Sequence, residues 1–136
     1  MHHFQLRVRY GDTDRMGFAY YANYLRWFEI GRAEMMRSLG RTYREIEEAG
    51  ISLPVVEAHC RYRKAALYDD LIAIETGVAD LGRASVRFSY RVVREADGEV
   101  LATGHTMHCY LDKAGRPARA PAELLALLER APRAEA

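Results

Sequence analysis

One apolar helical segment, followed by four long segments of alternating polarity, constrains the fold of this chain most strongly. From Asn23 to Leu39, apolar residues recur at the spacing of a helix, and further apolar residues widen the stripe beyond one face. A helix with so broad an apolar surface is predicted to be largely buried. Gly40 follows as its C-terminal stop, because glycine readily adopts the left-handed conformation that ends many helices.

The remaining segments predict strands that surround this helix. Alternation is clearest at Val86, Phe88, Tyr90 and Val92, and similar patterns span residues 4–10, 51–64, 71–80, 84–94 and 100–111. Short helices are expected over 42–49, with Thr42 as N-cap, and after Pro121. This order predicts an α+β fold in which one antiparallel sheet wraps one long helix. We expect a single domain over residues 1–130 and a flexible tail over 131–136.

Long strands leave long sheet edges, and an unprotected edge in a native protein is either covered or paired. We therefore expect two copies of the chain to form a homodimer with a continuous sheet.

Composition excludes several classes of protein. The 20 basic and 19 acidic residues nearly balance, which argues against nucleic-acid binding. No apolar run approaches the roughly 18 residues of a membrane span, and no signal peptide is recognisable, so we expect a cytoplasmic protein. Cys60 and Cys109 show no paired spacing and are expected to be free thiols.

Chemistry is concentrated in the loop that joins the first strand to the long helix. Asp12 and Asp14 lie two residues apart between Gly11 and Gly17, and the helix that starts at Asn23 has free backbone amides in its first turn. A carboxylate beside donors that can stabilise developing negative charge supplies the parts of an acyl-transfer site.

The loop belongs to an ordered pattern that covers most of the chain. Its elements are Gly11-Asp12-Thr13-Asp14, Gly17, Asn23-Tyr24, Tyr68-Asp69-Asp70-Leu71, Gly82-Arg83-Ala84-Ser85 and Pro117-Ala118-Arg119-Ala120-Pro121. This pattern resembles the 4-hydroxybenzoyl-CoA thioesterase-like family of hot-dog fold acyl-CoA thioesterases. The resemblance implies a hot-dog fold, an acyl-CoA substrate, no cofactor or metal, and homodimers that often form homotetramers with active sites at the dimer interface.

The resemblance also implies roles for individual residues. Asp14 would be the catalytic carboxylate, as nucleophile or general base, and the backbone amide of Tyr21 would stabilise the oxyanion. Substrate contacts are expected from Gly17, Tyr20, Asn23 and Tyr24, and from Arg83 through the phosphates of CoA. We expect Asp12 to be structural, because loop Asp residues commonly bond to nearby backbone groups.

Other interpretations remain open at this level. Glu29 and Glu34 are rival catalytic carboxylates, although helical spacing favours ion pairs with nearby Arg residues, and we expect Glu29 to be the less exposed of the two. A hot-dog hydratase or dehydratase would require a histidine facing the helix start, and a binding module would hold acyl-CoA without turnover. His105 and His108 lie three apart on a predicted strand, so their side chains cannot easily share a metal ion.

Overall fold

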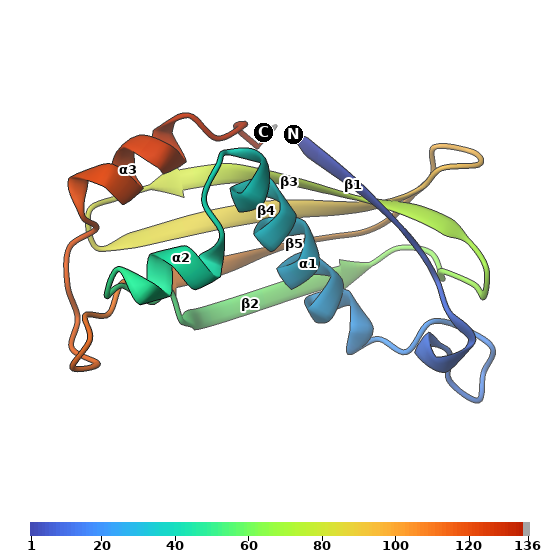
Figure 1. Ribbon diagram of the computed structural model, residues 1–136. Helices are drawn as coiled ribbons and strands as arrows, with labels where there is room; N and C mark the ends of the chain where they lie inside the picture. Colours follow the sequence, from blue (N-terminus) through green and yellow to red (C-terminus); the bar gives the residue numbers. More distant parts are fainter. Residues whose placement is uncertain (135–136) are drawn as a thin grey trace.

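The computed structural model describes residues 1–134 and contains one five-stranded antiparallel sheet in the order β1-β3-β4-β5-β2 (Figure 1). The elements are β1 (His2–Arg7), the 3₁₀ turn η1 (Tyr10–Asp12), α1 (Asn23–Ser38), α2 (Tyr43–Glu48), β2 (Val55–Tyr62), β3 (Leu71–Leu81), β4 (Ser85–Arg94), β5 (Val100–Cys109) and α3 (Ala122–Glu129). Figure 1 shows α1 lying across one face of the sheet. The predicted α+β hot-dog architecture is confirmed.

The apolar surface of α1 forms the centre of the core. Trp27, Phe28 and Met35 are fully buried, and the ring of Phe28 stacks on that of Tyr90 in β4, with centroids 4.4 Å apart. Gly31 permits this close approach, because a Cβ atom there would lie 2.5 Å from the side chain of Ile74 in β3. The breadth of the apolar stripe thus reflects a helix that is covered on most sides.

Local signals account for most boundaries, with corrections at two strands. Thr42 caps α2 through a capping box with Glu45, as predicted. The first strand ends at Arg7 rather than at residue 10, because the chain turns into η1. The second strand begins at Val55 rather than at residue 51, directly after Pro54, which has no N–H to donate to a ladder.

Residues 131–134, the first part of the predicted tail, lie against the sheet. Ala131 is buried, the N–H of Val78 in β3 donates to the Pro132 carbonyl at 2.9 Å, and the N–H of Ala134 donates to the Val78 carbonyl at 3.0 Å. A Cβ atom on Gly77 would lie 2.7 Å from the backbone nitrogen of Ala134, so glycine allows this contact. Residues 135 and 136 of the predicted tail lie outside the described residues.

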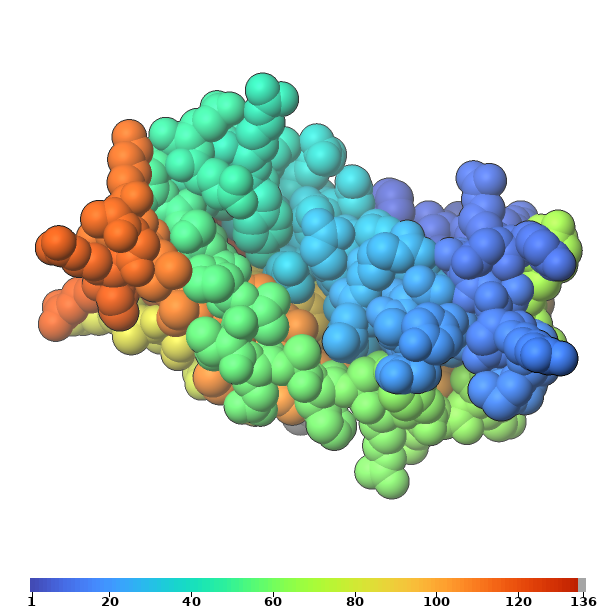
Figure 2. All heavy atoms as spheres, turned by 90° about the horizontal axis from the view of Figure 1, so that it is seen from below, coloured from blue at the N-terminus to red at the C-terminus, as the bar shows by residue number. Residues whose placement is uncertain are grey.

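The edge strand β2 is exposed along its length. Val55 is 48% and Val56 is 59% exposed. Figure 2 shows β2, in green, at the surface beside the blue loop that precedes α1. Uncovered apolar side chains on a long edge are unusual in a protein that stays monomeric.

A chain of buried polar side chains crosses the sheet beneath α1. Arg32 donates to the Tyr90 hydroxyl at 3.0 Å, Tyr90 and Thr106 hydroxyls are 2.6 Å apart, and Thr106 lies 2.8 Å from Nε2 of His108. His108 Nδ1 lies 2.9 Å from the Leu53 carbonyl oxygen. A neutral His108 that donates from Nδ1 and accepts at Nε2 matches each hydrogen bond of this chain, whereas the buried Nε of Arg32 has no partner within the described residues.

Acidification is expected to destabilise the protein through His108. Burial, together with the charge of Arg32, lowers the pKa of His108 from 6.5 to about 4, and the Leu53 carbonyl only partly opposes this. Between pH 4 and 6.5 the unfolded chain therefore binds more protons than the native one, so the free energy of unfolding rises with pH across this window. The stabilisation that neutral His108 contributes to the free energy of unfolding is complete above pH 6.5 and is lost below pH 4. Its maximum is about 3 kcal/mol.

Thermal melts at pH 4.5, 5.5 and 7 measure this effect. His108→Gln is expected to flatten the pH dependence, whereas the control His105→Gln, on the outer face of the sheet, should retain it. Equal pH slopes for wild type and His108→Gln would contradict the assignment.

Candidate functional site

Asp14 is anchored by one carboxylate oxygen and leaves the other available. Its Oδ1 accepts from the N–H of Met16 at 2.9 Å and of Phe18 at 3.4 Å. Gly17 donates to the Asp14 carbonyl at 3.0 Å and closes the turn with a φ of +87°, which favours glycine. Within residues 1–134, Oδ2 accepts no hydrogen bond. Asp14 therefore shapes the loop and still presents a free oxygen.

Asp12 ties the loop to α1, as its predicted structural role requires. Its Oδ1 lies 2.7 Å from the guanidinium of Arg26, and its Oδ2 accepts from the N–H of Arg9 at 2.9 Å. Its carbonyl oxygen accepts from the N–H of Tyr20 and from the side-chain amide of Asn23, both at 2.7 Å. The side chain of Asn23, which is predicted to contact substrate, bonds to this loop.

The start of α1 is uncapped. Ala22 occupies the N-cap position in helical conformation, and no side chain of the described residues caps the first turn. Within the part of the chain that the structure describes, the N–H groups of Tyr21 and Ala22 donate to no acceptor. Free amides at a helix start provide a site for negative charge.

A shallow pocket of about 250 Å³ brings Asp14 and Tyr21 together. Its lining residues are Asp14, Met16, Phe18, Ala19, Tyr21, Tyr24, Tyr62, Arg63, Lys64 and Ala65. The segment from Tyr62 to Ala65, at the end of β2, was not identified from the sequence. No motif marks it; the only available signal was that a predicted strand ends there.

The other predicted contacts are distributed unevenly around this pocket. Tyr24 lines it and is almost fully buried, and its hydroxyl accepts from the N–H of Ala66 at 3.3 Å. The ring of Tyr20 packs on that of Tyr21, with centroids 4.8 Å apart, outside the lining. Gly17 shapes the turn without lining the pocket.

Arg83 does not reach this pocket within one chain. It follows β3, whereas Asp70, which precedes β3, accepts from the N–H of Val8 near the loop. The 11 residues of β3 span about 36 Å, which separates the two ends of the strand. Within one chain, Arg83 therefore lies at the far end of β3 from the Asp14 loop.

The rival residues lie elsewhere. Glu34 pairs with Arg37 at 3.4 Å, as its spacing predicted. Glu29 is exposed and Glu34 is only partly so, so the expected order of exposure was wrong. His105 stacks on His59, whereas His108 is buried beneath α1. Among residues 1–134, no three His, Cys, Asp or Glu side chains are grouped to hold a metal ion, and no helix is long and apolar enough to cross a membrane.

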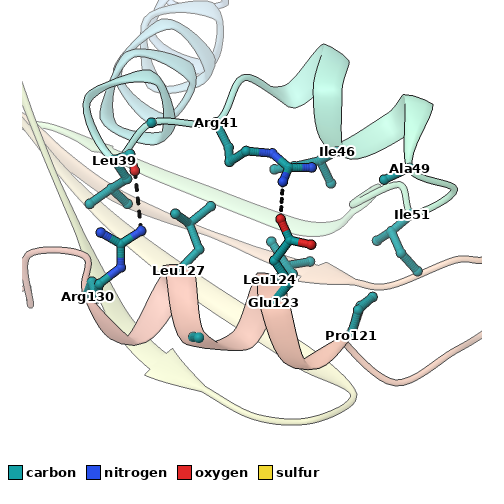
Figure 3. A pocket seen from close by; sticks show the side chains of 12 residues that line it. Leu39, Arg41, Ile46, Ala49, Ile51, Pro121, Glu123, Leu124, Leu127 and Arg130 are labelled. Atoms are coloured by element: carbon teal, nitrogen blue, oxygen red, sulfur yellow. Dashed lines mark hydrogen bonds and ion pairs between the residues drawn. The ribbon is translucent and has the colours of Figure 1, made fainter.

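A larger cavity, of about 540 Å³, lies at the other end of α1, about 24 Å along the helix. Figure 3 shows it between the end of α1, α2 and α3, bridged by the Arg41–Glu123 ion pair and by Arg130, which donates to the Leu39 carbonyl at 3.4 Å. Its lining is mostly aliphatic, and its one carboxylate, that of Glu123, is paired with Arg41. The candidate active site is therefore the smaller pocket at Asp14.

Comparison with known families agrees with this geometry. The model of the thioesterase-like superfamily matches residues 8–128. The chain belongs to this superfamily. Among superfamily relatives, it is 38% identical over 92 residues to the acyl-CoA thioesterase YbgC of Haemophilus influenzae, covering 67% of this chain and 68% of that protein. It is 30% identical to the 1,4-dihydroxy-2-naphthoyl-CoA hydrolase of Synechococcus elongatus, with 83% of each covered.

A solved superfamily structure has the same fold. The DHNA-CoA thioesterase from Staphylococcus aureus superposes with a TM-score of 0.82 at 30% identity, covering 86% of this chain and 78% of that one. The superfamily assignment therefore rests on both sequence and structure.

Proposed function

We propose that this protein is an acyl-CoA thioester hydrolase whose active site is the Asp14 pocket. The observation that carries the proposal is that one pocket brings together Asp14, which has a free carboxylate oxygen, and Tyr21, whose backbone N–H is free like that of the adjacent Ala22. The names of its relatives, acyl-CoA thioesterase and CoA-ester hydrolase, support the same chemistry.

Two routes are open to Asp14. As a nucleophile, its carboxylate attacks the thioester carbonyl carbon, the C–S bond breaks, CoA leaves as the thiolate, and water then hydrolyses the mixed anhydride. As a general base, it removes a proton from a water molecule that attacks the same carbon. In both routes the carbonyl oxygen becomes negative and is stabilised by the helix-start amides, at about 3 kcal/mol per donor.

The end of β2 provides a cation for the CoA moiety. Arg63 lines the pocket and forms no ion pair within residues 1–134, whereas Lys64 pairs with Glu99 at 2.7 Å. A guanidinium group suits the phosphates of CoA, because its planar fork can donate two hydrogen bonds. We propose Arg63 as a phosphate contact from the same chain.

We propose that the working enzyme is a homodimer, which can pair further into a homotetramer. The pocket of about 250 Å³ is open and small for an acylated pantetheine arm, so a second chain would complete it. Pairing of exposed β2 edges would cover Val55 and Val56 and offers Arg83 of the second copy a route to the substrate.

Sedimentation velocity is expected to give twice or four times the 15.5 kDa chain mass. Val56→Lys is expected to shift the protein toward the monomer, because a lysine on an edge strand disfavours pairing. An unchanged mass for this variant, with the fold intact by circular dichroism, would argue that chains associate through another surface.

The proposed activity is tested by thiol release from short aliphatic, long aliphatic and aromatic acyl-CoAs. Turnover of at least one class supports the proposal and identifies the acyl preference. Binding of CoA esters without hydrolysis would instead indicate a non-catalytic module, and hydration of an enoyl-CoA would indicate a hydratase.

A further inference from the structure

Tyr62 connects the edge strand β2 to the start of α1. The residue ends β2, and its hydroxyl donates to the carbonyl oxygen of Tyr21 at 2.9 Å. Its ring meets that of Tyr21 edge-on at 6.4 Å between centroids and that of Tyr24 edge-on at 4.9 Å. Two aromatic contacts and one hydrogen bond therefore fix Tyr62 against the residues that precede and open the helix.

The bonded carbonyl belongs to the peptide unit that carries the free N–H of Ala22. In a trans peptide the C=O and N–H bonds point in opposite directions, and no cis peptide occurs within residues 1–134. A hydrogen bond that holds the Tyr21 carbonyl therefore aims the Ala22 N–H to the other side, out of the helix start. The N–H of Tyr21 is fixed less directly, through the Cα atom it shares with that carbonyl.

Within residues 1–134, no other side chain performs this task at the helix start. Ala22 offers no capping group, and the side-chain oxygen of Asn23, an acceptor that could have capped the turn, accepts from Arg26 at 3.4 Å instead. Among described side chains, the Tyr62 hydroxyl is the one that bonds to the Tyr21–Ala22 peptide. Without it, this peptide unit would keep only its bonds to the first turn of α1.

We propose that Tyr62 is a positioning residue that holds the Tyr21–Ala22 peptide, so that the helix-start amides face the thioester carbonyl during hydrolysis. The role rests on the proposed function. Partial burial raises the pKa of Tyr62, so its hydroxyl keeps the proton that it donates. Amides that are fixed before the reaction stabilise the oxyanion better than amides that must reorient.

Tyr62→Phe tests this role, because it keeps the ring and removes only the hydroxyl. We expect kcat for the best acyl-CoA to fall roughly tenfold while KM stays within about twofold, since the amides act on the transition state. Tyr68→Phe is the matched control: Tyr68 is 59% exposed, and its hydroxyl forms no hydrogen bond within residues 1–134. It should retain wild-type kcat.

A second readout is independent of turnover. The ¹⁵N–¹H resonances of Tyr21 and Ala22 should shift, and their amide hydrogen exchange should quicken, in Tyr62→Phe but not in Tyr68→Phe. Unchanged amide signals in Tyr62→Phe would overturn the positioning role, as would a lower melting temperature with unchanged kcat. If the wild type hydrolyses no thioester, the proposed function fails, and the amide signals still decide whether Tyr62 holds this peptide.

Discussion

Asp14→Asn is expected to lower kcat for acyl-CoA hydrolysis by at least roughly a hundredfold, with the fold intact. Asparagine keeps the size of the side chain, and its amide oxygen can still accept from the N–H groups of Met16 and Phe18. It removes the charge and hence both the nucleophile and the base. Single-turnover thiol release, with circular dichroism as a check on folding, measures the effect.

Glu29→Gln is the matched control, because it removes the same charge from the exposed face of α1, outside the pocket. We expect it to keep activity within about twofold of wild type. The assignment would be refuted if Asp14→Asn retained full activity, and a large loss in Glu29→Gln would transfer the catalytic role to the helix.

Phe28→Ala is expected to have the largest effect on stability, about 4 kcal/mol in the free energy of unfolding. The side chain is fully buried, its ring stacks on Tyr90 with planes 5° apart, and it also faces Gly104 in β5. Truncation would leave a cavity between α1 and the sheet, because neither strand can move inward without breaking its ladder. Urea unfolding of the purified variant measures the loss.

Leu25→Ala provides the comparison on the same helix, because Leu25 is 43% exposed. Its cost should stay below about 1 kcal/mol. Similar losses for the two variants would show that helix formation, rather than burial against the sheet, supplies the stabilisation.

Periodicity predicted the fold well because β3, β4, β5 and α1 each have buried residues facing a shared core. Val86, Phe88, Tyr90 and Val92 alternate because β4 lies at the centre of the sheet, with α1 on one side. The capping box at Thr42 could also be predicted from the sequence, because it depends on two residues only three positions apart. The position of residues 131–134 against β3 was not predicted. Their contacts with β3 are backbone hydrogen bonds, which the pattern of side chains in the sequence does not reveal.

The candidate site was predictable only where it lies within one loop. Asp14 and Tyr21 are close in sequence, and the structure brings them to one pocket. Tyr62 lies 41 positions from Tyr21, so its role depends on how β2 is placed beside α1. Arg83 is the opposite case. Its position in the motif suggested a substrate contact, but the motif could not show that Arg83 follows β3 at the far end of the sheet.

The docking of the C-terminal segment also fixes where the chain can be joined or extended. His2 pairs with Thr76, and Ala134 bonds to Val78, so both ends of the described chain meet at one stretch of β3, as Figure 1 shows. This edge lies across the sheet from β2. A short linker between the ends would suit a circular permutant, and a fused partner attached there would leave the Asp14 loop and the β2 edge unobstructed.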